Sequence, residues 1–417
     1  MRFFFPDSQD QIDPSFDFTT EQRSPHRVRQ RDDKYAHEVL SQSPYGGLLV
    51  SKPIVDGLPG TSGKYTVAQR NRLYRQGAHT FFRLRNADTN LQIMGDCGAF
   101  TYVREETPVY TVDEVIDFYE GCGLDFGLAM DHVIFGYDAA LDENPASVPK
   151  DWTRRQDLTL SLAQQFLDRC GERGTTFEPF GIAHGWSPGS YAFSVAELQR
   201  IGYTKIALGG MVPLKTPDIL DSLNAVHEML DSETELHMLG VTRTSYVQEF
   251  ANYGVTSFDS TSPFRQSFQD DRDNYYTTNS SFVAIRVPQV DGNTRLRKLV
   301  AAGEIDQRDA RKYEKACLRD LRRLAEGTCT SEAAVESVRR YSDLIGEKKD
   351  RSDQYLETLT ARPWETCRCD MCKDIGIEIV VFRGAERNRR RGFHNLWVFA
   401  DRLARSLDAP IFSPASI

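Results

Sequence analysis

The sequence lacks any long run of apolar residues. Its first apolar stretch, Phe3 to Phe5, stops at Pro6 and is too short for a secretory signal peptide. No later stretch approaches the ~20 apolar residues that a membrane-spanning helix needs. The 8 cysteines in 417 residues are mostly scattered singly, which is not the pattern of a secreted disulfide framework. We therefore expect a soluble, cytoplasmic protein with no membrane partner.

Positive charge is also scarce, because 51 lysines and arginines face 60 acidic residues and give a formal net charge of −9. This balance argues against a protein that binds nucleic acid by bulk charge alone. The charge is uneven, however. Near the C-terminus a dense basic run contains Arg383, Arg387, Arg389, Arg390 and Arg391. Such a run is often only a solvated face, and contact with phosphates is the alternative.

Three cysteines stand close together immediately before this basic run. Cys367, Cys369 and Cys372 lie within six positions, and His394 follows the arginines. Three thiolates and one imidazole make a closed tetrahedral zinc site. A disulfide fits less well in a reducing compartment, and cysteines unrelated to metal are the remaining alternative. We predict a structural Zn²⁺ ion bound by these four residues. Four protein ligands leave no coordination position for a water molecule, which argues against a zinc hydrolase.

Strand and helix patterns alternate at least five times between residues 91 and 259, with short connections. Capping patterns at Thr111-Val112-Asp113-Glu114 and Ser194-Val195-Ala196-Glu197 are expected to open two of the helices. This alternation predicts a parallel sheet covered by helices, either doubly wound or closed as a (β/α)8 TIM barrel. The glycine fingerprint of a dinucleotide-binding sheet is absent. Polar or glycine residues follow the predicted strands at their C-terminal ends, namely Asp96, Asp131, His184, Gly209, Gly210 and Asp259. Because a barrel collects such residues at one rim, we predict an α/β fold of the TIM-barrel type.

The pattern divides the chain into four segments. Residues 1–45 read as an irregular N-terminal arm, and residues 46–265 as the main part of the catalytic barrel. Residues 266–360 read as a helical insertion, in which one apolar stripe consists of Tyr313, Cys317, Leu321 and Leu324. The insertion is either a helical hairpin packed on the barrel or a docking surface for nucleic acid or a partner protein. Residues 361–417 read as a zinc-binding subdomain that also supplies a closing strand, near Ile377 to Phe382, and the last helix.

Two carboxylates at one rim are the minimum for displacement at a sugar carbon, because one attacks while the other handles the proton of the leaving group. A single aspartate at a strand end can instead cap the next helix. Glycines at the rim let backbone amides approach a flat ligand, although such glycines are common. Phe100 could stack on a purine or belong to the core.

In this order along the chain, five motifs resemble the tRNA-guanine transglycosylase family. They are Gly95-Asp96-Cys97-Gly98-Ala99-Phe100, Ala207-Leu208-Gly209-Gly210, Met238-Leu239-Gly240-Val241, Phe258-Asp259-Ser260 with Pro263 and Arg265, and the cysteine cluster with its distant histidine. The resemblance covers about residues 90–265 and 365–407. It implies a (β/α)8 barrel with a zinc-bearing subdomain that exchanges a guanine in nucleic acid for a 7-deazaguanine.

The resemblance also implies roles for single residues. Asp259 would attack C1′ and hold a covalent glycosyl intermediate, and Asp96 would be the general acid and base. Base-binding positions would be Asp131, Phe100, His184, Gly185, Gly209, Gly210, Leu239 and Gly240. Nucleic-acid contacts would come from Arg265, Arg387, Arg389, Arg390 and Arg391. The target base would have to leave its stack to reach such a pocket.

Departures from the family pattern point to its DNA-modifying branch. His184-Gly185-Trp186 replaces a glutamine followed by two glycines, and a long insertion separates Asp259 from Cys367. Together with the arginine run, these features look like the DpdA branch, which places a 7-deazaguanine such as preQ0 into DNA. The expected partners are DNA, guanine and the deazaguanine base, and the resemblance leaves open a partner ATPase that opens the DNA.

Two other hypotheses stand beside a DNA-guanine transglycosylase. The first is the same chemistry on tRNA, in a queuosine-type pathway. The second is a catalytically silent barrel that only binds nucleic acid, which the joint presence of Asp96 and Asp259 disfavours.

Overall fold

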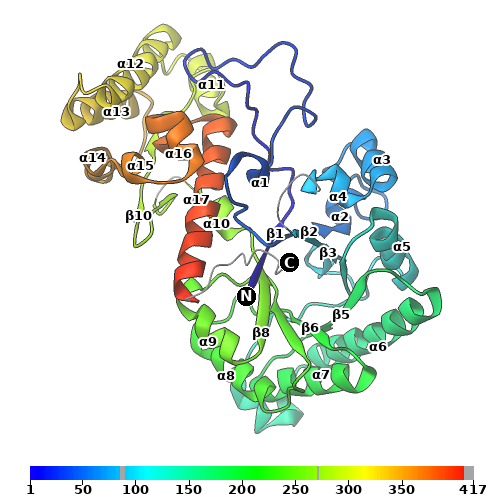
Figure 1. Ribbon diagram of the computed structural model, residues 1–417. Coiled ribbons are helices and arrows are strands. Elements are labelled where there is room, and N and C mark those ends of the chain that lie inside the picture. The colour runs from blue at the N-terminus through cyan, green and yellow to red at the C-terminus, as the bar shows by residue number, and fades with distance from the viewer. Residues whose placement is uncertain (85–89, 270–271, 408–417) are drawn as a thin grey trace. The chain divides into compact units, whose positions relative to one another are not determined.

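A computed structural model describes residues 1–84, 90–269 and 272–407 of the chain (Figure 1). These residues form two compact units. Of the described residues, unit 1 contains 1–9, those between 45 and 261, and 403–407. Unit 2 contains residues 10–44 and 262–402.

Unit 1 is built around a closed barrel of eight parallel strands (Figure 1). The strands are β1 (Arg2–Pro6), β2 (Gly47–Ser51), β3 (Gln92–Asp96), β4 (Phe126–Leu128), β5 (Glu178–Ala183), β6 (Lys205–Leu208), β7 (Glu235–Met238) and β8 (Val255–Asp259). Each strand pairs with the next along the chain, and β8 closes the barrel on β1. The predicted (β/α)8 barrel is therefore confirmed.

Helices connect the strands of unit 1. They are α2 (Lys52–Val55), α3 (Val67–Gln76), α4 (Ala78–Phe81), α5 (Val112–Cys122), α6 (Lys150–Arg173), α7 (Pro188–Ile201), α8 (Thr216–His227) and α9 (Val247–Asn252). Short 3₁₀ turns lie between them, among them Ala99–Thr101, Ala139–Asp142, Pro145–Ser147 and Thr244–Tyr246. Within the described part of the chain, every helix is too short or too polar to cross a bilayer.

Local capping chemistry explains where α5 begins and ends. The side chain of Thr111 accepts a hydrogen bond from the backbone N–H of Glu114 at 3.2 Å, and the Glu114 carboxylate accepts one from the N–H of Thr111 at 2.7 Å. This reciprocal pair satisfies two N–H groups that the first turn leaves free. The helix ends at Gly123, whose φ of +63° suits glycine. The predicted start of this helix at Thr111 is confirmed.

Helix α7 begins earlier than the sequence suggests. We expected Ser194 to cap it, but Ser187 is the N-cap and its side chain accepts from the N–H of Ser190. Pro188 occupies the first helical position, where its missing N–H costs nothing. Ser194 lies inside the helix and donates its hydroxyl to the carbonyl oxygen of His184. Ser187 is the N-cap because a serine followed by proline favours a helix start more than Ser194, which no proline follows.

The interior of the barrel is packed with side chains that point inward from its strands. This core contains Phe4, Leu49, Met94, Phe126, Leu128, Phe180, Ile182 and Ala207. Phe126 meets Phe4 and Phe180 edge to face, at ring-centroid distances of 6.2 and 5.5 Å. Because these rings fill the centre, the barrel is not a channel, and ligands can bind only at its ends.

The prediction of an irregular N-terminal arm is wrong for its first residues. Arg2–Pro6 is barrel strand β1, and Phe3, Phe4 and Phe5 are buried. Phe3 lies beside Phe258 of β8 and Phe5 beside Tyr45 just before β2. The sequence shows only a short apolar run before a proline, and its pairing partners are distant along the chain. Residues 10–44 belong to unit 2, where Ile12 and Leu40 are buried.

Unit 2 is mostly helical. Its helices are α1 (Ala36–Val39), α10 (Ser262–Gln266), α11 (Thr294–Ala301), α12 (Gln307–Ala325), α13 (Ser331–Leu344), α14 (Ser352–Ala361), α15 (Pro363–Thr366), α16 (Asp370–Ile375) and most of α17 (Gly384–Ser406). Its short strands are β9 (Tyr275–Tyr276), β10 (Ser281–Phe282), β11 (Ile285–Arg286) and β12 (Val381–Phe382). Helices α12 and α13 pack on each other as the predicted hairpin.

Two details of unit 2 differ from expectation. Cys317, Leu321 and Leu324 of α12 are buried as predicted, but Tyr313 is 38% exposed. The predicted closing strand is also wrong, because Ile377 to Val380 form a 3₁₀ turn and β12 pairs with β11. The barrel needs no closing strand from this region, since β1 already fills that place.

Candidate active site and metal centre

The C-terminal ends of the barrel strands bring the predicted polar residues to one rim. Asp96 ends β3 and Asp259 ends β8. Three further positions follow the ends of β4, β5 and β6: Asp131, His184 and the Gly209-Gly210 pair. All the strands run parallel, so these ends share one mouth of the barrel.

Asp259 is 8% exposed and is held by two donors. Its Oδ1 atom accepts from the backbone N–H of Gly240 at 3.0 Å and lies 3.3 Å from Nε2 of His237. His237 is fully buried, and its Nδ1 lies 2.8 Å from the hydroxyl of Ser257. If the Ser257 hydroxyl donates to Nδ1 of His237, the ring proton lies on Nε2, and Nε2–H can donate to Asp259. Among the described residues, no donor contacts the other oxygen, Oδ2.

His237 is a site residue that sequence reasoning missed. It interrupts the apolar residues Leu236 and Met238 of β7, and a histidine inside a barrel strand is a signal that could have been noticed. Its ring lies edge to face with Phe4 and Phe180 of the barrel core. Packing on these rings fixes the ring plane, so that His237 presents one nitrogen to Asp259.

Asp96 has a different environment. Its Oδ1 accepts from the N–H of Gly98 at 2.9 Å. Removal from water and the charges of Asp131 and Asp259 raise the pKa of Asp96 to about 6, against the lowering effect of hydrogen bonds from Gly98 and Ser51. A carboxyl group with this pKa exchanges protons readily near neutral pH.

Gly98 must be glycine for Asp96 to be held in this way. Its φ is +76°, and a Cβ atom there would come within 2.2 Å of the Pro53 ring and 2.9 Å of the Ser51 hydroxyl. Any larger residue would therefore displace the turn that presents its N–H to Asp96.

Asp131 and His184 form a buried pair at the rim. Nε2 of His184 lies 2.6 Å from Oδ2 of Asp131, and the thiol of Cys97 donates to Oδ1 at 3.3 Å. Asp131 is 4% exposed and His184 only 1%. Both oxygens of Asp131 thus have partners within the protein. Nδ1 of His184 is buried and, among the described residues, makes no hydrogen bond.

The glycines of the rim lie against this pair. A Cβ atom on Gly209 would come within 2.4 Å of Cε1 of His184, so the absence of a side chain lets the imidazole pack on the backbone. The N–H of Gly209 donates to the carbonyl of Ala183, and its carbonyl accepts from the Tyr191 hydroxyl. Gly185 packs against the first turn of α7, where a Cβ atom would meet the backbone nitrogen of Tyr191 at 2.7 Å.

The two apolar residues predicted to sandwich a base differ in exposure. The ring of Phe100 is 57% exposed and lies 5.3 Å from the ring of Phe135, which is 44% exposed. Leu239 is partly buried against the barrel core. The two exposed rings lie together and present an apolar surface to solvent.

The arginine run is where the structure departs most from the predicted nucleic-acid contacts. Arg387, Arg390 and Arg391 are at most 2% exposed, so a phosphate cannot reach their guanidinium groups. The prediction that they contact nucleic acid is therefore wrong for the folded protein. Arg389 is partly exposed and donates to the carbonyl of Gln11, while Arg265 on α10 is exposed. Only these two remain available to a polynucleotide.

Internal carboxylates explain why the arginines are buried. Arg387 pairs with Glu21 and Glu378, each at 2.6 Å. Arg390 pairs with Glu386 at 2.9 Å. Partial burial alone raises the pKa of Glu21, but hydrogen bonds and charge from Arg383 and Arg387 lower it to about 2. The run therefore ties residues 10–44 to α17 within unit 2.

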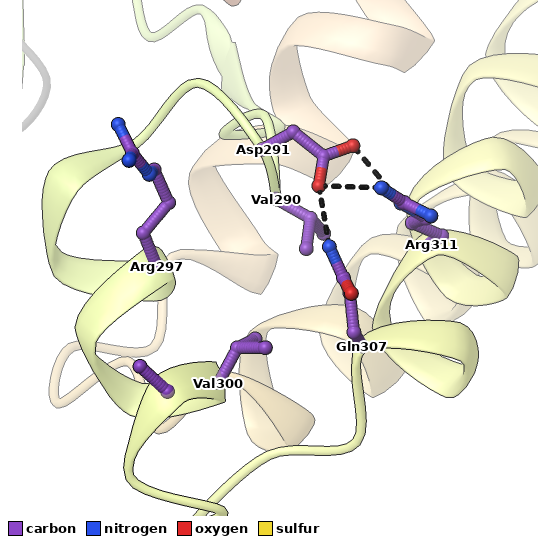
Figure 2. A pocket seen from close by; sticks show the side chains of 7 residues that line it. Val290, Asp291, Arg297, Val300, Gln307 and Arg311 are labelled. Atoms are coloured by element: carbon purple, nitrogen blue, oxygen red, sulfur yellow. Dashed lines mark hydrogen bonds and ion pairs between the residues drawn. The ribbon is translucent and has the colours of Figure 1, made fainter.

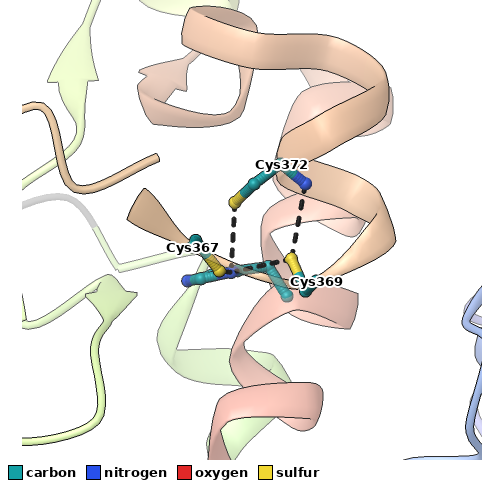
Figure 3. A group of neighbouring side chains, drawn as sticks. Cys367, Cys369 and Cys372 are labelled. Atoms are coloured by element: carbon teal, nitrogen blue, oxygen red, sulfur yellow. Dashed lines mark hydrogen bonds between the residues drawn. The ribbon is translucent and has the colours of Figure 1, made fainter. Parts of the chain in front are cut away.

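The four predicted metal ligands gather in unit 2 (Figure 3). The donor atoms of Cys367, Cys369, Cys372 and His394 all lie within 4.8 Å of one another. Nδ1 of His394 is 3.5, 3.3 and 3.4 Å from the three sulfur atoms in that order. Tetrahedral bonds of about 2.3 Å to sulfur and 2.0 Å to nitrogen place these atoms roughly 3.5 Å apart. The cluster can therefore hold one metal ion.

Neighbouring groups orient the ligands. Nε2–H of His394 donates to the carbonyl oxygen of Tyr276 at 2.8 Å, which leaves Nδ1 as the metal-binding atom. The ring of Tyr275 stacks on His394 at 4.1 Å, and its hydroxyl contacts the sulfur of Cys372 at 3.2 Å. Such outer contacts fix the tautomer and the ring plane before the metal binds.

Comparison with known proteins places this site in a family. No protein-family model matches the chain. A curated relative from Salmonella montevideo, described as a DNA-guanine transglycosylase, is 48% identical over 412 residues, which is 98% of this chain and 97% of the relative. The chain belongs to the guanine transglycosylase family. The transglycosylase resemblance drawn from the five motifs is thus confirmed, and the protein is an enzyme of this class.

Proposed function

We propose that this guanine transglycosylase acts on DNA and exchanges guanine for a 7-deazaguanine base such as preQ0. The observation that carries the proposal is the contrast between two carboxylates at one rim. Gly240 and His237 hold one oxygen of Asp259, while its other oxygen meets no donor among the described residues, and the pKa of Asp96 is raised to about 6. One group is suited to attack and the other to proton transfer. The name of the Salmonella relative supports DNA as the polymer.

The reaction proceeds by two displacements at C1′ of the target nucleotide. The target base first leaves the helix to enter the pocket. Oδ2 of Asp259 attacks C1′ while the bond to N9 of guanine breaks, and Asp96 gives its proton to the departing base. The incoming base then loses a proton to Asp96, and its ring nitrogen attacks C1′ and releases Asp259. After both displacements Asp259 is again a free carboxylate and Asp96 again carries its proton, as in retaining glycosidases.

The pair of Asp131 and His184 is proposed to read the base. Nδ1 of His184 is a buried nitrogen that lacks a partner in the described chain, so a base that supplies one gains an interaction of roughly 1–3 kcal/mol. Asp131 fixes the histidine through Nε2. The proposed base site also includes the backbone of Gly210 and Gly240. The ring of Phe100 and the side chain of Leu239 complete it.

The cluster in unit 2 is proposed to hold a structural Zn²⁺ ion. Three cysteines and one histidine match the preference of zinc for sulfur and nitrogen ligands and leave no coordination position for water. The metal would stabilise unit 2, and the base exchange depends on the carboxylates of unit 1.

Isotope transfer tests the proposed function. The purified protein is incubated with labelled guanine or preQ0 and either duplex DNA or tRNA. We expect label in DNA only. Label confined to tRNA would establish the tRNA reaction instead, and binding of DNA without label in either polymer would favour a non-catalytic barrel.

The raised pKa of Asp96 predicts how the first displacement depends on pH. As a general acid Asp96 must be protonated, and its fraction in that form falls above pH 6. We expect kcat/KM for DNA to fall about tenfold per pH unit well above that value. The Asp96→Asn variant should be slower by roughly 10²- to 10⁴-fold and should lose this limb of the profile. An unchanged alkaline limb in the variant would assign the proton transfer to another group.

A further inference from the structure

Helix α12 concentrates positive charge in a chain that is otherwise acidic. Between Gln307 and Ala325 it carries seven lysines and arginines and three acidic residues, whereas the whole chain has a net charge of −9. Two of its three acids, Glu314 and Asp320, are buried. The solvent-facing side of the helix is thus far more basic than the composition suggests.

Five of these cations form one stripe. They are Arg308, Lys312, Lys315, Arg319 and Arg323, and all are exposed. Their spacing of four, three, four and four residues keeps them on one face of an α-helix, and fifteen residues at 1.5 Å extend the stripe to about 22 Å. The opposite face holds the buried residues Ala310, Cys317, Leu321 and Leu324. We call these five cations the basic stripe.

The basic stripe is poorly neutralised by the protein. Within the described part of the chain, no carboxylate pairs with Arg308, Lys312 or Lys315. Arg319 pairs only with its neighbour Asp320, and its side chain is still 62% exposed. Arg323 donates to the carbonyl oxygen of Thr328. Like charges three and four residues apart repel one another, so the isolated stripe is mildly unfavourable.

The two other cations of α12, Arg311 and Arg322, are already paired. Figure 2 shows Arg311 turned to Asp291, whose Oδ1 also accepts a hydrogen bond from Nε2 of Gln307. These three residues line a pocket of about 610 Å³. Arg322 pairs with Glu378 at 2.7 Å. The free positive charge of α12 is thus confined to the stripe and is not spread over its surface.

We propose that the basic stripe binds the phosphate backbone of the DNA duplex. Duplex DNA carries one negative charge per about 1.7 Å of its axis, so a straight row of about 22 Å can contact several phosphates. Exposed arginines and lysines are typical donors to DNA phosphates, and such contacts position the duplex without selecting its sequence. This surface rests on the proposed function, because it assumes that DNA is the polymer.

Salt-dependent binding tests the stripe. The double variant Lys312→Gln/Lys315→Gln and the wild type are titrated with a fluorescent duplex of arbitrary sequence at several salt concentrations. Each phosphate contact contributes about 0.9 to the slope of log K against log salt. We expect the variant's slope to be smaller by about 2 and its affinity to fall on the order of tenfold or more near ~0.1 M salt. Label transfer at saturating DNA should keep the wild-type kcat.

The matched control removes the same charge from the same insertion. Arg339 and Arg340 on α13 are exposed but already pair with Glu336. Arg339→Gln/Arg340→Gln should keep nearly the wild-type slope. An unchanged slope in the Lys312/Lys315 variant, or an equal loss in the control, would overturn the proposal. Failure of the proposed function would give a different result: the wild type would transfer no label to DNA. The salt dependence of duplex binding is measured in a separate experiment, so the two failures can be told apart.

Discussion

Asp259→Asn is expected to abolish base exchange, with a loss of kcat on the order of 10⁴-fold or more. An amide is a very poor nucleophile toward C1′. The substitution keeps the shape of the side chain, and its amide oxygen can still accept from Gly240 and His237, which now hold Oδ1 of Asp259. The fold and the binding of DNA should therefore be retained, and the loss should appear in kcat and not in KM.

Asp113→Asn is the matched control for this prediction. It makes the same chemical change on α5, where Asp113 is half-exposed and pairs with Arg169. Surface ion pairs contribute about 0–1 kcal/mol to stability, so this variant should exchange bases at the wild-type rate. Label transfer into DNA by Asp259→Asn within tenfold of the wild-type rate would remove Asp259 from the role of nucleophile.

Loss of the proposed zinc ion should unfold or loosen unit 2. Three sulfur atoms and a histidine nitrogen lie within 4.8 Å of one another, and all but Cys367 belong to buried residues. Without a cation, thiolates held this close repel one another in a poorly solvated site. We expect Cys372→Ser, or prolonged chelation, to lower the free energy of unfolding by several kcal/mol. For a unit of this size that corresponds to a fall in Tm of roughly 10 °C.

Cys329→Ser provides the comparison. Cys329 also lies in unit 2, is partly exposed and contacts none of the cluster. It should bind metal and melt like the wild type. Elemental analysis should find one zinc per chain in the wild type and in Cys329→Ser. Full zinc content and an unchanged Tm in Cys372→Ser would show that the cluster is not the metal site.

The fold was largely predictable because its signals are local. Alternating strand and helix patterns, capping pairs such as Thr111 with Glu114, and aspartates at strand ends each occupy a few neighbouring residues. Together they predicted a barrel and the rim where Asp96 and Asp259 lie. The metal cluster was predictable for the same reason, since three of its four ligands are close in sequence.

The features that sequence reasoning missed depend on distant partners. Strand β1 is stabilised by pairing with β8, in which Ser257 lies opposite Arg2 although some 250 residues separate them in sequence. The short apolar run of β1 alone was therefore a weak signal for a strand. The burial of Arg387 follows from Glu21, which lies 366 residues earlier. A basic run shows its charge in the sequence but not its counter-ions. His237 was missed because only the fold shows that its ring meets Asp259.

The most direct test of the central claim is to look for the covalent intermediate on Asp259. The wild-type protein is mixed with duplex DNA in the absence of any incoming base, denatured, digested and examined by mass spectrometry. A transient ester between Asp259 and C1′ of an abasic nucleotide predicts a protein–DNA adduct on the peptide that contains this residue, absent in Asp259→Asn. Base exchange that proceeds with no adduct, or with an adduct on a different residue, would contradict it.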